Sequence, residues 1–343
     1  MDKSELLSLI QETFAPNIAE LVAAMMLPVV MLAPAPDAED SLTFTGGAPV
    51  MSAEIPWPMP LARDERLADT WTAEYYQTGK DRAKVALPLS FMAQVDLATL
   101  PDLAVSSELP REGRLLFFFN PMSGAFELGP RFSRVIWDKS PAETVVPHQT
   151  PEALLMAELE ERIIFEEVME AYRLPEKTGI SGLIDRLLGR APDLATDDPV
   201  PAFFVVPKQT ARLAEGAIFP DRRAYEAEPT YSRILGDLIG DDAMDFEESY
   251  FDLIHESEFF PYMLGPPIPE QDDPRFHTAG EALNWKGKRE EREAAARHWT
   301  LLLQVQFTHW YGRESDGTVY FLIHEDDLKA RRFEAVFAVY QQT

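Results

Sequence analysis

Two apolar stretches, residues 89–96 and 301–307, carry the same order of side chains in the two halves of the chain. Each stretch alternates like a strand and places one glutamine, Gln94 or Gln304, near its end. Because successive strand side chains point to opposite faces, the odd-numbered apolar residues are predicted to share one face and the glutamine to lie on the other. A loop and a second apolar strand, launched from a glycine, follow each stretch. The pattern indicates an internally duplicated chain.

The rest of the chain shows helical and strand-like spacing in turn. Helices are predicted over residues 3–14, 17–26, 151–173, 180–189, 230–240, 243–258, 288–297 and 325–330, with a short helix or insertion over 70–84. Strands are predicted after Pro28 and over residues 114–119, 202–206 and 335–341. In the third helix Leu155, Leu159 and Ile163 stand at helical spacing and are expected to face the core. The glutamates of that helix are expected to form a solvated face.

Composition and charge narrow the classes of protein. A chain of 343 residues, 46% of them hydrophobic, can bury a core as one large or two ordinary domains. The 31 basic and 58 acidic residues give a net charge of −27. This charge argues against nucleic acid and anionic membranes as partners, and it attracts basic proteins. The absence of cysteine excludes disulfides, thiolate metal sites and cysteine nucleophiles.

The N-terminal residues do not match the pattern of a targeting segment. Residues 21–33 form an apolar run that is too short to span a bilayer as a helix. The preceding twenty residues carry four acidic side chains against Lys3 alone, whereas a signal peptide needs a positive region there. A cytoplasmic protein is therefore expected.

No catalytic or metal-binding motif stands out. The order Asp241-Asp242-x-x-Asp245 is similar to a magnesium–diphosphate site, but no second metal motif accompanies it. Asp252-x-x-His255 is a single carboxylate–histidine pair, whereas a di-iron bundle needs two such motifs and further glutamates. A glycine-flanked serine elbow and the His-Glu-x-x-His motif are both missing. We predict no catalytic residue, metal or cofactor, and the sequence favours a non-enzyme without settling the question.

A set of short motifs resembles one known family. The first half contains Gly46-Gly47 before Pro49, Trp57-Pro58, residues 87–96 around Gln94, and Gly113-Arg-Leu-Leu-Phe-Phe. The second half contains Gln271-Asp-Asp-Pro-Arg275, Leu301-Leu-Leu-Gln304, Gly317-x-x-x-Phe321 and Glu325-Asp-Asp-Leu-Lys-Ala. In this order the motifs, which span about residues 25–343, resemble the YwqG-like family, a bacterial domain family of unknown function. The resemblance implies an α+β fold, internally duplicated, with mostly antiparallel β-sheets and flanking helices.

The resemblance also suggests how the chain is divided. Residues 1–40 are expected to hold two helices and a lead-in strand, residues 41–150 the first YwqG-like half, and residues 151–343 the second half with a helical insertion around 175–201. Members usually have a second glycine-rich turn before the Gln–Asp–Pro segment, part of which is replaced here by Leu264-Gly265-Pro266-Pro267. Because proline cannot adopt positive φ, that loop is expected to follow a different path.

The polar residues of these motifs are the candidate binding residues. They are Gly46, Gly47, Trp57, Gln94, Gln271, Arg275 and Gln304. One interpretation is structural: Gln94 fixes the loop of residues 46–57, Gln304 fixes the loop of residues 271–275, and Trp57 fills the core. The other interpretation is that Trp57, Arg275 and the two glutamines converge on a cleft between the halves.

Three functional hypotheses remain. Residues 228–273 carry 13 acidic residues against Arg233 alone, and we expect an acidic partner face at Asp241, Asp242, Asp245, Glu247 and Glu248. The first hypothesis is a non-catalytic acidic interaction protein of the immunity type, which binds and neutralises a basic toxin or enzyme; YwqG-like domains occur in toxin–immunity gene neighbourhoods. The second is a module that binds a sugar or peptide in the cleft. The third is an enzyme of unrecognised chemistry. The sequence does not determine the oligomeric state.

Overall fold

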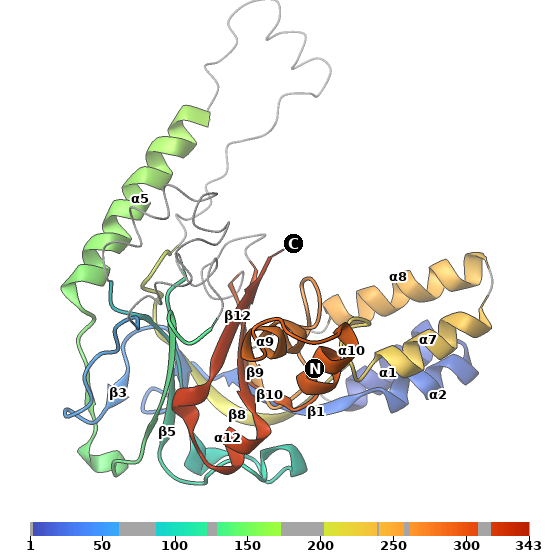
Figure 1. Cartoon of the computed structure of the whole chain (residues 1–343), viewed down its shortest axis with the longest axis horizontal. Coiled ribbons are helices and arrows are strands. Elements are labelled where there is room, and N and C mark those ends of the chain that lie inside the picture. Colours follow the sequence, from blue (N-terminus) through green and yellow to red (C-terminus); the bar gives the residue numbers. More distant parts are fainter. Residues whose placement is uncertain are drawn as a thin grey trace, which may run out of the picture.

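A curved ten-stranded sheet organises the protein (Figure 1). The computed structural model describes residues 3–61, 87–121, 129–172, 202–238, 240–256, 261–307 and 317–342. The strands are β1 (Leu27–Pro34), β2 (Phe44–Thr45), β4 (Ser90–Asp96), β5 (Arg114–Phe119), β6 (Ser133–Asp138), β8 (Gln209–Ile218), β9 (Tyr262–Met263), β10 (Trp299–Gln306), β11 (Thr318–His324) and β12 (Phe337–Gln341). Their spatial order is β12-β11-β10-β9-β1-β8-β2-β4-β5-β6, and the strand pairs are antiparallel.

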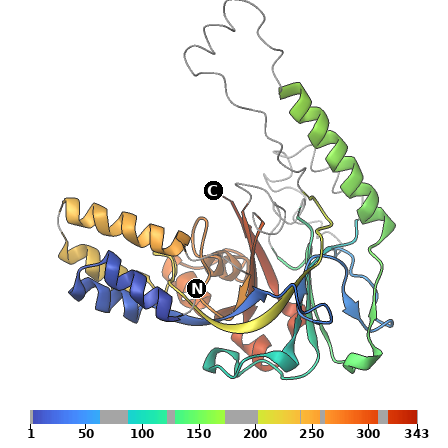
Figure 2. The same ribbon diagram turned by 180° about the vertical axis from the view of Figure 1, so that it is seen from behind.

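Helices pack around this sheet, which confirms the predicted α+β class with a mostly antiparallel sheet. The helices are α1 (Lys3–Thr13), α2 (Pro16–Ala24), α5 (Glu152–Tyr172), α7 (Glu228–Asp237), α8 (Asp241–Glu256), α9 (Pro274–Ala282), α10 (Arg289–Ala296) and α12 (Glu325–Lys329). Both ribbon views show α1, α2, α7 and α8 together at one end of the molecule and α5 projecting from the other (Figures 1 and 2). A pair of short strands, β3 (Val50–Met51) and β7 (Val146–Pro147), lies apart from the main sheet.

The concave face of the sheet encloses the main core. Phe117 on β5 and Phe321 on β11, from opposite flanks of the sheet, meet with ring centroids 5.2 Å apart. Near the two sheet ends, the backbone N–H of Gly129 donates to the carbonyl of Ala338 over 3.2 Å. The sheet therefore curls until its ends approach each other.

The two central strands each join segments that are distant in sequence. Strand β1 lies between β8 and β9, and β8 lies between β1 and β2. The lead-in strand of residues 27–34 is thus placed among strands from the C-terminal part of the chain, and β8 beside strands from the N-terminal part.

A β-bulge in each glutamine strand changes the predicted alternation. The register shifts between Phe91 and Ala93 in β4 and between Leu301 and Leu303 in β10. Ahead of the bulge, Phe91 and Leu301 pack in outer clusters, while Ala93 and Leu303 belong to the main core. The prediction of one unbroken apolar face on each strand is therefore wrong, because a bulge inserts one residue and reverses the facing of what precedes it.

Steric crowding explains why a glycine directly precedes each of the strands β5 and β11. A side chain on Gly113, whose φ is +75°, would collide with the backbone carbonyl of Asp138. A side chain on Gly317 would collide with the carbonyl of Gln341. Each glycine thus allows the neighbouring strand, β6 or β12, to approach closely at its last residue.

Helix α5 buries a different face from the predicted one. Leu154 is fully buried against Phe203 and Phe204. Leu155, Leu159 and Ile163, which were expected in the core, are about half exposed.

Glu158, one of the glutamates predicted to be solvated, explains why residues 202–206 differ from their predicted strand. Glu158 is buried, and its Oε2 accepts backbone N–H bonds from Phe203, Phe204 and Val205 over 2.9, 2.6 and 3.2 Å. Residues 202–206 therefore do not form the predicted strand, because a side chain takes the donors that a sheet ladder would use.

Most other predicted elements are confirmed within two to three residues of their ends. Strands β6 and β8 and helix α9 were not predicted. The predicted elements at residues 70–84 and 180–189, and the whole insertion around 175–201, lie outside the described residues.

Candidate functional site

Gln94 is fully buried in β4 and fastens the glycine loop from within. Its Oε1 accepts the backbone N–H of Val50 over 2.9 Å, and its Nε2 donates to the carbonyl of Leu42 over 2.9 Å. These two bonds bracket the Gly46-Gly47 turn, where both glycines have positive φ. The prediction that Gln94 fixes this loop is confirmed.

Gln304 makes a similar set of bonds in β10. Its Oε1 accepts the backbone N–H of Ile268 over 3.0 Å and lies 3.0 Å from the hydroxyl of Tyr262. The bonded segment precedes the predicted loop of residues 271–275. Gln271 itself is exposed, and its Nε2 donates to the carbonyl of Gln342.

The two loops resemble each other despite the prolines of the second. Val50 and Ile268 each come six residues after the first residue of the short strand, β2 or β9, that pairs with the glutamine strand. Directly after each short strand the backbone takes positive φ, +63° at Gly46 and +64° at Leu264. The following residues differ, because Gly47 has positive φ and Gly265 does not. The expectation that the Pro266-Pro267 loop departs from the path of other family members stays a prediction.

Trp57 fills space between two apolar clusters. Its indole N–H donates to the carbonyl of Leu89 over 2.7 Å, and its ring packs edge-to-face on Phe118 with centroids 5.6 Å apart. The backbone N–H of Gly47 donates to Val206 over 2.6 Å. These contacts agree with the structural interpretation of the loop.

Arg275 is buried in an ion-pair network at the start of α9. Its guanidinium donates to Glu226 through two nitrogens, at 2.6 and 2.7 Å, and to Asp273 at 2.9 and 2.6 Å. Burial alone would lower the pKa of Arg275, but the bonds and charges of the two carboxylates outweigh it and raise that pKa. Burial likewise opposes the ionised form of Glu226, yet the bonds from Arg275 hold its pKa below the ordinary value. The donors of Arg275 are thus used within the protein.

The structure does not bring the predicted cleft residues together. Gln94 lies on β4 and Gln304 on β10, and four strands separate them in the sheet. Trp57 and Arg275 also bond within their own surroundings. A shared ligand site is not formed by these polar atoms in the part of the chain that is described.

We predict that Gln94→Leu lowers the free energy of unfolding by about 2–3 kcal/mol, because it leaves the half-buried N–H of Val50 and the half-buried carbonyl of Leu42 unpaired. Gln304→Leu is expected to have an effect of similar size. Gln306→Leu is a matched control on β10, where a half-buried glutamine is replaced in the same way. Urea unfolding followed by circular dichroism measures all three. Equal stability of the three variants would contradict the fastening role.

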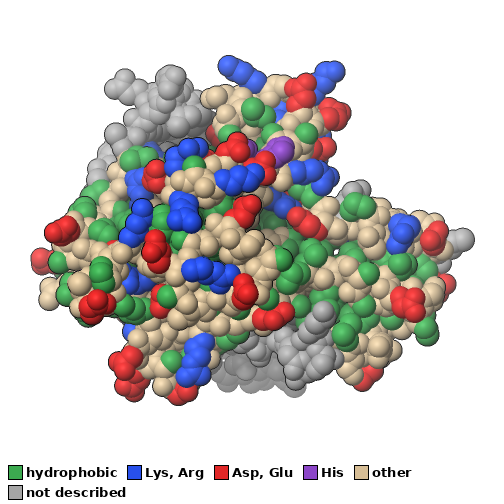
Figure 3. Space-filling model, turned by 90° about the horizontal axis from the view of Figure 1, so that it is seen from below, with side chains coloured by type: hydrophobic (Ala, Val, Ile, Leu, Met, Phe, Trp, Pro, Cys, Tyr) green, Lys and Arg blue, Asp and Glu red, His purple; other side chains and the backbone are tan. Residues whose placement is uncertain are grey.

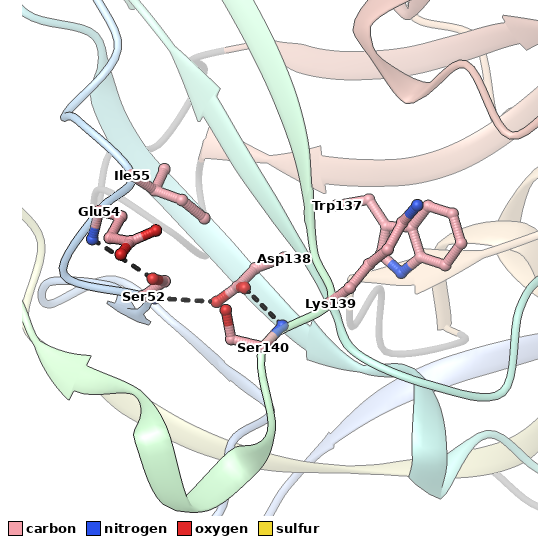
Figure 4. A pocket seen from close by; sticks show the side chains of 7 residues that line it. All are labelled: Ser52, Glu54, Ile55, Trp137, Asp138, Lys139 and Ser140. Atoms are coloured by element: carbon pink, nitrogen blue, oxygen red, sulfur yellow. Dashed lines mark hydrogen bonds between the residues drawn. The ribbon is translucent and has the colours of Figure 1, made fainter.

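A shallow depression of about 560 Å³ lies beside the end of β6 (Figure 4). Its lining residues are Ser52, Glu54, Ile55, Trp137, Asp138, Lys139 and Ser140. Figure 4 shows Trp137 and Lys139 together on one side, and Nζ of Lys139 lies 4.1 Å from the centroid of the indole.

Of the two carboxylates in this lining, Glu54 is exposed and Asp138 is buried and bonded through both oxygens. The Oδ2 of Asp138 accepts from the backbone N–H of Ser52 and from buried Arg114, each over 3.0 Å, and its Oδ1 accepts from Ser140 over 2.9 Å. Burial favours the neutral acid, but these bonds outweigh it and lower the pKa of Asp138. Asp138 is therefore a structural anion and not a free general base.

The predicted acidic partner face lies on α8. Asp241, Asp242, Asp245 and Glu248 are exposed, and none forms an ion pair with another described residue. Glu247 differs, because it accepts a 3.1 Å bond from Arg222. The opposite side of α8 is anchored by Phe246, Tyr250, Leu253 and Ile254, which are buried.

Two large apolar side chains accompany these carboxylates. Met244 and Phe251 on α8 are 64% and 56% exposed. On the face drawn in Figure 3, by contrast, acidic and basic side chains are interspersed. The acidic excess is therefore not gathered on that face, and α8 offers a surface that is both acidic and apolar.

Other site classes find little support among the described residues. They contain no group of three His, Asp or Glu side chains placed to hold a metal ion. The side chain of His255, and with it the Asp252–His255 pair, lies outside the described residues. None of the described helices is both long and apolar enough to cross a membrane.

Comparison with family models places most of the chain in one family. A family model described as "Domain of unknown function (DUF1963)" matches residues 43–341. The matched range begins at β2 and includes both glutamine strands and α8. The comparison with curated proteins finds no match.

Proposed function

The chain belongs to the DUF1963 family, whose function is unknown, and we propose a function from its surface. We propose that it is a non-catalytic acidic interaction protein of the immunity type, which binds and neutralises a basic protein. The observation that carries the proposal is the outer face of α8. Four exposed carboxylates there have no described ionic partner, and two large apolar side chains lie among them. Neighbouring carboxylates attract a basic surface over long range, and apolar side chains stabilise the docked complex.

We further propose that the chain is YwqG-like within this family and arose by internal duplication. The ordered motifs support the first statement. The second is supported by the strand order, which reads the same from both ends if β4 is paired with β10 and β5 with β11. Each glutamine strand also has a bulge at the same place, between the third and the first residue before the glutamine. In both halves the glutamine accepts a backbone N–H from its loop, that of Val50 or that of Ile268.

The test compares the protein with a variant that has a neutral α8 face. Asp241→Asn, Asp242→Asn, Asp245→Asn and Glu248→Gln are combined, and both proteins are used as bait in extracts of the native host at low salt. We expect the wild type to retain a stoichiometric basic protein that salt releases, and the neutral variant to lose it. With the purified partner, association measured by stopped flow should slow about tenfold in the variant.

The control removes the same number of charges elsewhere. Exposed Glu39, Asp40, Glu143 and Glu334 are changed to their amides. Equal loss of the partner in both quadruple variants would show that only net charge matters and would reject α8 as the binding face. A bait that emerges alone would favour the alternative of a small-ligand module, for which the depression beside Trp137 is the place to screen sugars and peptides.

A further inference from the structure

We propose that the outward face of α5 is a second docking surface, which binds an amphipathic helix of a partner protein whose apolar side is flanked by Lys and Arg. The inference does not rest on the proposed role of α8, because both views show the two helices at opposite ends of the molecule (Figures 1 and 2).

The inner face of α5 is held firmly, which fixes the direction of its outer face. Leu154 is fully buried and packs with Phe203 and Phe204. The Oε2 of Glu158 accepts three backbone N–H groups of residues 203–205, and its Oε1 accepts a 2.6 Å bond from Arg162. Phe165 packs on Phe203 with ring centroids 6.0 Å apart.

The outer face carries a continuous apolar stripe. Leu155, Met156, Leu159 and Ile163 are 48%, 58%, 53% and 48% exposed. Their spacing of three and four residues places them side by side over two turns of the helix. Large apolar side chains in such a row, on a helix that is already anchored, are typical of a helix-binding surface.

The charges along the stripe decide between possible occupants. Glu152, Glu160, Glu166 and Glu167 are exposed on α5. Arg162 is the single basic residue of the helix, and it is paired with Glu158. Apart from this paired arginine, the exposed charges on the described part of α5 are negative.

A second copy of this chain would place glutamates against glutamates, and like charges beside an apolar seam oppose pairing. An anionic lipid surface would be repelled for the same reason. A partner helix with apolar residues at the seam would pack on the stripe, and Lys or Arg beside the seam would pair with the glutamates of α5.

The test uses a labelled 21-residue helical peptide with Leu at the seam positions and Lys and Arg beside them. Fluorescence anisotropy is followed on addition of the full-length protein at low salt. We expect saturable binding that weakens at least about tenfold in Leu159→Gln/Ile163→Gln and is reduced by salt. Both residues are about half exposed, so the variant should keep its circular dichroism spectrum and melting temperature. Leu283→Gln, which changes a large apolar side chain that is 40% exposed at the end of α9, is the control and should bind like the wild type.

A photoreactive side chain at the centre of the peptide should cross-link to residues 155–163. The proposal is overturned if the peptide does not bind, if binding is unchanged in the double variant, or if a peptide with Glu in place of Lys and Arg binds equally. It is also overturned if sedimentation shows a wild-type dimer that the double variant abolishes, since a second copy would then cover the stripe.

Discussion

Arg275→Ala should lower the free energy of unfolding by about 3–5 kcal/mol, which is among the two largest losses that we expect for a single substitution. The substitution removes four charge-assisted hydrogen bonds and leaves Asp273, which is buried, without its counter-charge. Denaturant unfolding at neutral pH measures the loss. Arg297→Ala is the control, because Arg297 is exposed and its guanidinium lies 4.6 Å from the ring centroid of Tyr225. Loss of this exposed cation–π contact should cost less than about 1 kcal/mol.

The same network predicts a dependence on pH. Because the pKa of Glu226 is lowered in the folded protein, its ion pair stabilises the fold above the unfolded pKa of about 4.5 and is lost as pH falls through the lower folded value. In Arg275→Ala this contribution is absent. The difference in stability between the two proteins should therefore shrink as the pH is taken from 6 to below 4. A constant difference would show that the guanidinium acts through packing alone.

Glu158→Ala should cost about 3 kcal/mol and release α5 from the segment that it covers. Three backbone N–H groups of residues 203–205 then lose their acceptor in a buried place, and each unpaired donor carries its own desolvation cost. Hydrogen exchange of these three amides is the direct measurement, and limited proteolysis within 151–172 is the second. The amides are expected to exchange at least about a hundredfold faster than in the wild type.

Two further variants test this anchor. Glu158→Gln keeps one acceptor oxygen and should lose about half as much stability. Glu160→Ala removes an exposed carboxylate from the same helix and should leave exchange at residues 203–205 unchanged. If Glu158→Ala and Glu160→Ala behave alike, the buried carboxylate is not the anchor of α5.

Elements with a strong local signal were predictable from sequence. The glutamine strands, α1, α2, α7 and α8 follow from apolar spacing and from flanking proline and glycine. Strand β8 was missed because its residues, Gln209–Ile218, include charged and small side chains without clean alternation. Its identity as a strand depends on β1, which pairs with it along eight residue positions.

The burial of individual side chains was harder to predict. In α5 the stripe of Leu155, Leu159 and Ile163 had the better helical spacing, yet Leu154 and Glu158 face the core. The face that α5 buries is decided by the backbone N–H groups of residues 203–205, which need an acceptor and find it in Glu158. Phe203 lies 45 residues after Glu158 in the sequence. No local periodicity contains that information.

The candidate site was predictable only in part. The sequence indicated Gln94 and Gln304 because a lone amide in an apolar strand needs partners, and the structure supplies them in both loops. It did not indicate that Arg275 would meet Glu226, since the two residues lie on different segments that only the fold brings together. The acidic residues of α8 could be predicted from the local composition, whereas the exposure of Met244 and Phe251 among them could not.

The interleaving of β1 and β8 has a consequence for how the chain reaches its native state. Residues 27–34 pair with residues 209–218 and with β9, so the earliest strand finds its neighbours only after more than half of the chain has been synthesised. Such non-local pairing slows folding, because loop closure precedes the contacts that reward it. A fragment that ends before β8 lacks the strand that joins β1 to β2, and neither fragment of a split chain is expected to fold alone. Mixed together, the two fragments should complement each other, since each supplies a central strand to the other.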